Sequence, residues 1–200
     1  QAIDQGMIVM IGDEVEEAYL DEVQKQCVNP ELAKEKGDTL KFVYTPFHGA
    51  GNKPVRKILK RIGFNNVVVV KEQELPDGDF PTVSYPNPEA AEAFELGLKL
   101  AKEVDADLVL ATDPDADRVG IAMKCPDGSY ELVSGNEVGV LLLDYICAGR
   151  IEKGTMPEKA VAVKSIVSTP LADAVAEHYG VELRSVLTGF KWIGDQIAQL

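Results

Sequence analysis

The stretch LVLATDPDADRVGIA, residues 108–122, places an apolar run on each side of three aspartates. Asp113, Asp115 and Asp117 alternate along the chain, and Arg118 follows directly. The apolar runs predict two buried strands, so the aspartates fall in the loop that joins them. Crowded carboxylates repel each other, and a bound Mg²⁺ or Ca²⁺, which takes several hard oxygen ligands, would remove this repulsion. The loop therefore predicts a metal site with these three aspartates as ligands.

Two other kinds of loop begin in a similar way. An EF-hand has Asp at its first, third and fifth positions, but it requires Gly at position six and Glu at position twelve. This chain has Arg118 and Lys124 at those positions. A phosphatase of the haloacid-dehalogenase type would use Asp113 as its nucleophile, yet it normally has Thr or Val where Asp117 stands. That phosphatase stays as an alternative, whereas a solvated acidic turn leaves the clustering unexplained.

Apolar patterns along the chain alternate between helix and strand, which predicts α/β layers with mainly parallel sheets. The valine-rich run 66–71 is typical of a strand buried on both faces of a parallel sheet. A turn at 125–129 should join the expected strands 118–123 and 130–134. The expected helices cover residues 13–27, 54–63, 87–104, 135–149, 168–180 and 190–200, and the other expected strands cover residues 39–45, 107–112, 159–165 and 181–187.

The predicted fold class is α/β, with two consecutive α/β units that contain mixed, mainly parallel sheets. Residues 1–12 are expected to be the tail of a preceding domain or a linker, residues 13–130 the first unit, and residues 131–200 the second. The second unit shows only two strands, so we expect it to be truncated. The chain also stops at Leu200 inside a predicted helix, and we expect it to be a piece of a longer protein.

Composition excludes some classes of partner. The 200 residues carry a formal net charge of −13, which argues against nucleic acid or an anionic membrane surface as a partner. No apolar stretch approaches the roughly 20 residues of a membrane span. The three cysteines, Cys27, Cys125 and Cys147, have no metal-binding spacing, and we interpret them as reduced thiols of a cytoplasmic protein.

Two glycine-containing loops run from strands into helices. In TPFHGAGNKPVR (45–56), the loop around His48, Gly49 and Gly51 could bind an anion through backbone N–H groups. Equally, the glycines could form a tight turn that His48 fixes by a hydrogen bond. In LTGFKWIGDQ (187–196), Lys191 could bind a phosphate or a sugar hydroxyl, or it could be an ordinary surface lysine.

Two further residues have both a functional and a structural interpretation. Lys164 ends an expected strand, and sites in α/β sheets lie at the carboxyl ends of strands. A lysine that extends from an apolar surface into water would look the same. Trp192 could stack on a sugar, or it could belong to the core.

Five motifs together resemble the α-D-phosphohexomutases, the family of phosphoglucomutase and phosphomannomutase. They are TPFHGAGNKPVR, ELPDGDFPTVSYPNPE, TDPDADRVGIA, SGNEVGVLLLDYI and LTGFKWIGDQI, in the family's order. The resemblance is closest to the bacterial phosphoglucomutase branch, and it implies four α/β domains around one cleft. This chain would be the second domain, residues 13–130, and the first part of the third, residues 131–200.

The resemblance also implies roles for particular residues. Asp113, Asp115 and Asp117 would hold Mg²⁺, and Arg118 would be catalytic by stabilising charge on the transferring phosphoryl group. The residues implied to bind the sugar phosphate are Lys164, Thr188, Gly189 and Lys191.

The implied reaction interconverts hexose 1-phosphate and hexose 6-phosphate through a phosphoserine, with glucose 1,6-bisphosphate as the intermediate when the sugar is glucose. The phosphoserine loop, a Gly-Glu-x-Ser sugar loop and the fourth domain are missing from these residues. We therefore expect this chain alone to be inactive, to require the first and fourth domains as partners, and to be monomeric. Phe190 stands where phosphomannomutase-like members have His, which favours glucose; a phosphopentomutase stays as an alternative.

Overall fold

The computed structural model describes residues 1–200. Backbone contacts divide the chain into two compact units, Gln1–Leu132 and Val133–Leu200. Both units alternate between strands and helices, so the predicted α/β class is confirmed.

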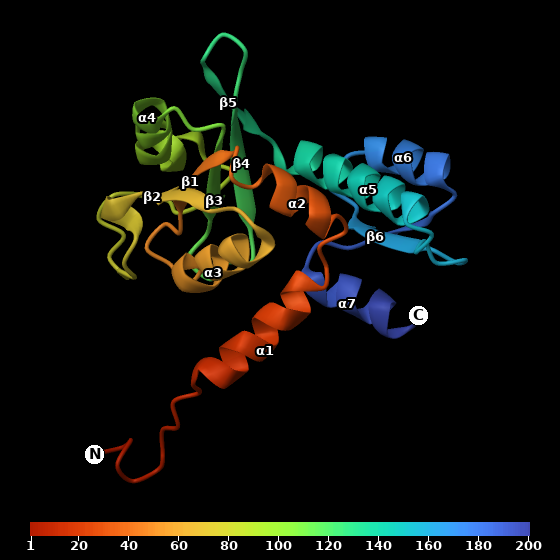
Figure 1. Cartoon of the computed structure of the whole chain (residues 1–200). Coiled ribbons are helices and arrows are strands. Elements are labelled where there is room, and N and C mark those ends of the chain that lie inside the picture. The colour runs from red at the N-terminus through yellow and green to blue at the C-terminus, as the bar shows by residue number, and fades with distance from the viewer. The chain divides into compact units, whose positions relative to one another are not determined.

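A five-stranded mixed sheet forms the centre of the first unit (Figure 1). Its strands are β1 (Lys41–Thr45), β2 (Asn66–Val69), β3 (Leu108–Thr112), β4 (Val119–Lys124) and β5 (Tyr130–Val133). Their order across the sheet is β2-β1-β3-β4-β5. β1 is parallel to both neighbours, with Val43 opposite Val68 on one side and Val109 on the other. β4 returns antiparallel to β3, as expected of two strands joined by a short loop.

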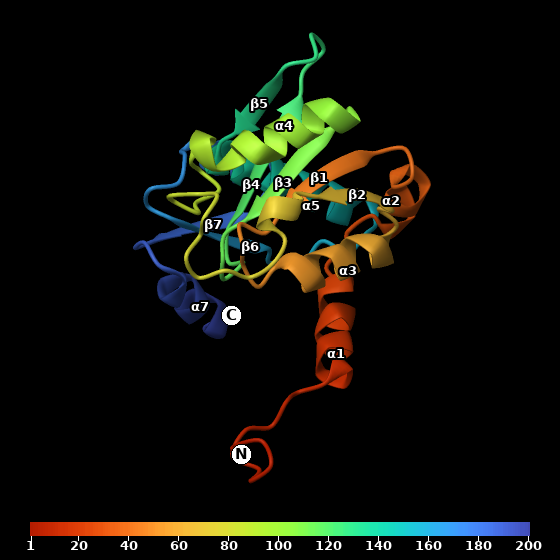
Figure 2. The same cartoon turned by 90° about the vertical axis from the view of Figure 1, so that its left-hand side faces the viewer.

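Helices cover both faces of this sheet (Figure 2). They are α1 (Asp13–Gln24), α2 (Pro30–Lys36), α3 (Asn52–Ile62) and α4 (Glu95–Val104). α4 packs on β1 and β3, and α1 and α2 pack on α3. The crossovers β1–α3–β2 and β2–α4–β3 run in opposite directions along the sheet, so the right-handed rule places α3 and α4 on opposite faces. The fully buried core between these layers includes Val43, Phe47, Phe94 and Val109.

The structure differs from the sequence expectations at three places in the first unit. The α-helix expected from residue 87 begins only at Glu95: the Asn87 side chain accepts the Glu89 N–H in a turn, and a short 3₁₀-helix covers Ala91–Phe94. The run 66–71 yields a short edge strand rather than a strand buried on both faces, and its Asn66 is exposed. The first helix ends at Gln24, and α2 was not expected.

The second unit contains two parallel strands, the number that the sequence predicts. Its elements are α5 (Gly135–Glu152), β6 (Val161–Ser165), α6 (Leu171–Tyr179), β7 (Glu182–Val186) and α7 (Phe190–Ala198). A capping box begins α5: Ser134 accepts the N–H of Glu137, and the Glu137 carboxylate accepts the N–H of Ser134. α5 packs against α6, and α7 contacts β6.

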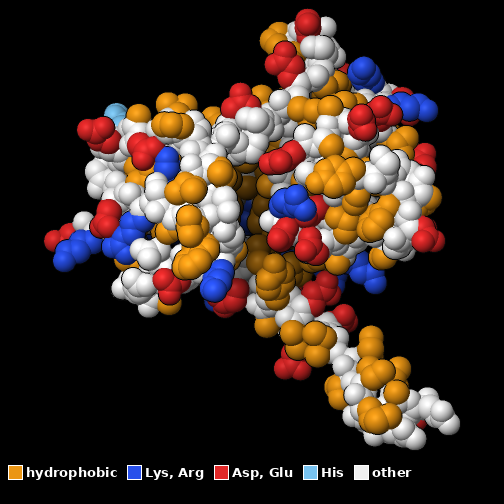
Figure 3. Space-filling view, turned by 180° about the vertical axis from the view of Figure 1, so that it is seen from behind, with side chains coloured by type: hydrophobic (Ala, Val, Ile, Leu, Met, Phe, Trp, Pro, Cys, Tyr) orange, Lys and Arg blue, Asp and Glu red, His pale blue; other side chains and the backbone are white.

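Apolar side chains are exposed along the N-terminal segment before α1. Met7, Ile8, Val9, Met10 and Ile11 are all exposed, and this segment projects at the lower right of Figure 3. None of the helices combines the length and the apolar composition that crossing a membrane requires.

Candidate metal centre

The three predicted aspartate ligands lie together at the carboxyl end of β3. The strand ends at Thr112, Asp113 follows it, and the chain returns into β4 at Val119. One oxygen from each of Asp113, Asp115 and Asp117 lies within 4.8 Å of the others. The loop therefore brings together the three carboxylates that the sequence analysis selected.

Asp113 is the fixed member of this group. Its side chain is 1% exposed, and both of its oxygens accept hydrogen bonds from Arg118. The backbone N–H of Arg118 donates to Oδ1 at 3.0 Å, and the guanidinium Nε donates to Oδ2 at 2.8 Å. Burial acts to raise the pKa of Asp113, but these two hydrogen bonds and the positive charge outweigh it, so the pKa is lowered. Asp113 is therefore held as a carboxylate.

Asp115 and Asp117 are exposed. The negative charge of Asp115 is the main reason that the pKa of Asp117 is raised, with burial and Asp113 adding to the effect. Arg118 offsets this only in part, because its Nε lies 3.7 Å from Asp117 Oδ1 and is already bonded to Asp113. The group thus has more negative charge than its neighbours balance.

The donor set fits a divalent cation. All three ligands are hard carboxylate oxygens, which Mg²⁺ and Ca²⁺ prefer. Two oxygens that both bind Ca²⁺ can be as far as about 5 Å apart, and two that bind Mg²⁺ can be about 4 Å apart. A spread within 4.8 Å therefore suits Ca²⁺ directly, and suits Mg²⁺ after a small movement of the exposed Asp115 and Asp117 side chains. The fixed Asp113 would anchor either ion.

Backbone contacts shape the aspartate loop from behind. Ala116 has a positive φ of 60°, and its N–H donates to the Asp113 carbonyl at 3.0 Å, which curls the loop. The N–H of Ala50 donates to the Pro114 carbonyl at 2.8 Å. A Cβ at Gly49 would overlap the backbone of Pro114. The loop that follows β1 therefore packs directly against the aspartate loop.

Three N–H groups of this supporting loop are already hydrogen-bonded to carbonyl groups. The N–H groups of His48, Gly49 and Ala50 donate to the carbonyls of Gln73, Pro46 and Pro114. The His48 ring lies between Leu75 and Thr82, with Nδ1 3.1 Å from the Leu75 carbonyl and Nε2 2.8 Å from Thr82 Oγ1. Of the two interpretations left open for this loop, the geometry favours a turn that His48 fixes.

A buried hydrogen bond supports the strand end beneath both loops. The Tyr44 hydroxyl lies 2.9 Å from Thr112 Oγ1, and burial raises the pKa of Tyr44 to about 12. A Cβ at Gly51 would lie 2.7 Å from Thr112 Oγ1 and 2.8 Å from the Tyr44 hydroxyl oxygen. Gly51 thus allows α3 to begin close to the end of β3.

The residues expected to bind a sugar phosphate lie at the carboxyl ends of β6 and β7 in the second unit. Lys164 is opposite Ser185 of the neighbouring strand. Its ammonium donates to the Thr169 carbonyl at 3.2 Å and forms an ion pair with Asp173. The positive charge of Lys164 is therefore compensated within this unit.

The turn after β7 is open to solvent. Thr188, Gly189 and Lys191 are exposed, and Trp192 is 41% exposed, so it is not among the buried residues of this unit. The Lys191 ammonium lies 5.2 Å from the centre of the Trp192 ring, within the range of a cation–π contact. This turn offers an ammonium, a hydroxyl and an aromatic face.

Asp173 is a residue that the sequence analysis missed. It lies in the first turn of α6, nine residues after Lys164, and it determines where the Lys164 ammonium rests. An acidic residue in the first turn of the helix that follows a strand-end lysine was the available signal. This signal is not specific, because carboxylates are common in the first turn of helices.

Comparison with known protein families shows to which family this chain belongs. The family model described as phosphoglucomutase/phosphomannomutase, alpha/beta/alpha domain II, matches residues 17–128, and the model of domain III matches residues 134–200. This chain belongs to the α-D-phosphohexomutase family. The family expected from the five motifs is therefore confirmed, and the two models follow each other along the chain in the family's domain order.

Individual members of the phosphohexomutase family agree with this assignment. A phosphoglucomutase of Staphylococcus saprophyticus is 40% identical over 98% of this chain and 34% of its own length. A phosphoribomutase of Saccharomyces cerevisiae is 37% identical over 98% of this chain and 33% of its own length. The crystal structure of a phosphoglucomutase/phosphomannomutase family protein from Burkholderia thailandensis shares the fold, with a TM-score of 0.64 and 21% identity over 88% of this chain and 36% of that one. The chain thus spans about a third of the length of the curated relatives it matches.

The contact between the two loops predicts the effect of Gly49→Ala. The added methyl group would overlap the Pro114 backbone, so the aspartate loop must move. We expect a loss of about 1–3 kcal/mol in the free energy of unfolding, measured by urea denaturation. Gly78→Ala is the matched control, because a Cβ there meets nothing within 4 Å. Equal stability of the two variants would contradict the close approach.

The pKa of Asp113 is lowered and that of Asp117 is raised, so we expect substitutions of these two residues to change the free energy of unfolding in opposite directions. At pH 7, Asp113→Asn should lower the free energy of unfolding by about 1–3 kcal/mol, because charged hydrogen bonds to Arg118 are lost. Asp117→Asn should raise it, since a repelled charge is removed.

The lowered pKa of Asp113 also determines how the effect of Asp113→Asn on stability depends on pH. The pKa of Asp113 is lowered on folding, so its contribution is complete above about pH 4, the ordinary pKa of Asp. The contribution disappears as the pH falls through the lowered value. Urea denaturation of wild type and Asp113→Asn between pH 3 and 7 measures it. A stability difference that grows toward low pH would contradict the assignment.

Proposed function

We propose that this chain is the metal-binding and sugar-phosphate-binding portion of a Mg²⁺-dependent phosphohexomutase that interconverts hexose 1-phosphate and hexose 6-phosphate. The observation that carries the proposal is the cluster of Asp113, Asp115 and Asp117, with Arg118 beside it, in a chain of this family. The phosphoserine is proposed to lie outside these residues. The protein would act in the cytoplasm, as a monomer.

In the proposed reaction, a hydroxyl oxygen of the sugar phosphate bonds to the phosphorus of the phosphoserine while the bond from phosphorus to the serine oxygen breaks. The hydroxyl loses its proton and the serine oxygen gains one, so the step leaves a free serine hydroxyl. The product is glucose 1,6-bisphosphate when the sugar is glucose. Transfer of its other phosphoryl group back to serine completes the isomerisation. Bound Mg²⁺ would withdraw negative charge from the phosphoryl oxygens.

Arg118 is proposed to meet the transferring phosphoryl group. Asp113 binds the guanidinium through Nε, which leaves the two terminal nitrogens available as donors, and the Arg118 side chain is 55% exposed. The hydrogen bond that Arg118 donates to Asp113 also raises the pKa of Arg118, so its charge is constant. Because Asp113 fixes the guanidinium beforehand, stabilising the transferred charge requires little rearrangement.

The second unit is proposed to bind the sugar phosphate. Thr188, Gly189 and Lys191 form an exposed turn with suitable donors, and Lys164 is the last but one residue of the adjacent strand β6. Glucose is the favoured sugar, because the relative that is 40% identical is a phosphoglucomutase. A pentose phosphate is the second candidate, because the relative that is 37% identical over the same share of this chain is a phosphoribomutase.

The phosphatase alternative is less well supported. A nucleophilic aspartate needs an oxygen that can reach the substrate phosphorus. Asp113 is buried, and both of its oxygens accept hydrogen bonds from Arg118. The geometry suits a metal anchor and a positioning group for Arg118 better than a nucleophile.

If Asp115 is a metal ligand, its substitution should stabilise the metal-free chain and weaken Mg²⁺ binding. Asp115→Asn should raise the melting temperature of the metal-free chain, because Asp115 is the main source of repulsion on Asp117. The same substitution should weaken Mg²⁺ binding by at least the roughly tenfold that losing an outer partner of a metal ligand costs. Calorimetric titration and thermal melts with and without Mg²⁺ measure both effects.

The control for this experiment is Asp79→Asn, an exposed aspartate on another loop. It should change neither quantity. Identical Mg²⁺ titrations of wild type and Asp115→Asn would remove the metal site from the proposal.

Because the phosphoserine is proposed to lie outside these residues, we expect the 200-residue chain to have no mutase activity. The purified chain with Mg²⁺, glucose 1-phosphate and glucose 1,6-bisphosphate should form no glucose 6-phosphate in a coupled dehydrogenase assay. Turnover that survives repurification and disappears in Arg118→Ala would show that the chain needs no external phosphoserine.

A further inference from the structure

The outer edge of β2 lies outside the proposed active site and is unpaired. β2 pairs with β1 alone, and Val70 donates its N–H to the Tyr44 carbonyl at 3.0 Å. Alternate residues of a strand present their backbone groups to opposite edges. Val68 therefore also faces β1, whereas Val67 and Val69 direct their N–H and C=O groups outward. These groups are free to pair with another strand.

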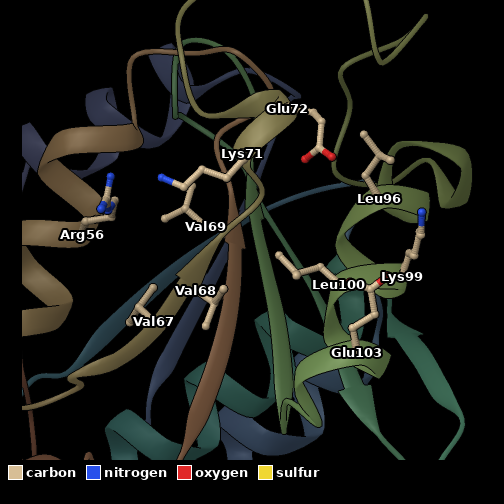
Figure 4. A pocket seen from close by; sticks show the side chains of 10 residues that line it. All are labelled: Arg56, Val67, Val68, Val69, Lys71, Glu72, Leu96, Lys99, Leu100 and Glu103. Carbon is tan, nitrogen blue, oxygen red and sulfur yellow. The ribbon is translucent and has the colours of Figure 1, made fainter.

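A cavity adjoins this edge on each side. The first, of about 480 Å³, lies between β2 and α4, where Leu96 and Leu100 form its apolar wall (Figure 4). The second, of about 410 Å³, lies between β2 and α3 and includes Phe64. Arg56 and Val67 line both cavities, so the two meet at the edge of β2.

The charge around this edge is opposite to that of the whole chain, whose formal net charge is −13. The cavities are lined by six cations and two carboxylates. Most of these cations lie on one face of α3, because their spacing of three or four residues is that of a helix turn. The cations are Lys53, Arg56, Lys57, Lys60, Lys71 and Lys99, and the carboxylates are Glu72 and Glu103.

Only half of these cations are neutralised inside the unit. Arg56 and Lys71 both pair with Glu74, each at 2.7 Å, and Lys57 pairs with Glu16 of α1. Three exposed lysines form no ion pair, and two of them are on α3. These are Lys53, Lys60 and Lys99. The α3 side of the edge therefore has excess positive charge, while the α4 side has an apolar wall.

We propose that the open edge of β2 binds an extended peptide segment of a partner protein in which apolar and acidic residues alternate. The segment would add a sixth strand to the sheet, with its backbone paired to Val67 and Val69. Side chains of a strand alternate between its two faces. One set would enter the apolar cavity beside Leu100, and the acidic set would meet Lys53 and Lys60. Pairing of β2 with the β2 strand of a second copy does not fit, because it would bring the lysine-rich sides of the two α3 helices together.

Fluorescence anisotropy with a fluorescein-labelled peptide, acetyl-VEVEVEV-amide, tests this proposal on the 200-residue chain. We expect saturable binding that weakens as salt rises, because charge pairs contribute to it. The double variant Lys53→Glu/Lys60→Glu should weaken binding more than tenfold. Lys102→Glu, an exposed lysine of α4 outside both cavities, is the matched control and should leave binding unchanged.

Backbone pairing is tested with N-methylated peptides of the same sequence. Methylation of alternate residues blocks the N–H groups along one edge of the ligand only. We expect one alternate set to abolish binding and the other to preserve it. The proposal is overturned by the absence of saturable binding, by equal binding of acetyl-VKVKVKV-amide, by an equal effect of Lys102→Glu, or by insensitivity to both methylated sets.

Discussion

The two hydrogen bonds between Asp113 and Arg118 determine how the rest of the candidate site is arranged. A carboxylate that is 1% exposed needs compensating donors, and a backbone N–H and a guanidinium of the same residue provide them. Because both donors belong to Arg118, the contact also closes the loop on itself. This one contact thus keeps the proposed metal ligand Asp113 ionised and holds the Arg118 guanidinium beside the other two aspartates.

The other two aspartates of the loop are exposed and repel each other, whereas Asp113 is buried and hydrogen-bonded. The charge of Asp115 raises the pKa of Asp117, and the nearby Arg118 offsets this repulsion only in part. The site combines one anchored carboxylate with two exposed ones that can move toward an ion. Such a combination sacrifices some stability of the metal-free chain for the ability to bind a cation, which is common at functional sites.

Local patterns predicted the local parts of this structure. The apolar runs on the two sides of the aspartates predicted the strand, the loop and the return strand, and the three carboxylates of the loop lie together. The contact of Gly49 with Pro114 could not be predicted in this way, because it joins segments 65 residues apart and depends on sheet order. The same limit explains β2: a run of valines indicates a strand but does not say whether another strand covers each edge. The metal and the sugar stay predictions.

The ion pair of Lys164 with Asp173 makes any anion binding at that lysine an exchange of partners. A phosphate that binds there would displace the Asp173 carboxylate, so the Lys164 ammonium would have an anionic partner throughout. The released carboxylate would stay in the first turn of α6, where the helix dipole stabilises a negative charge by about 0.3–1 kcal/mol. Lys164 would then discriminate by charge density: a dianionic phosphate would displace Asp173 more readily than a neutral sugar or a monoanion.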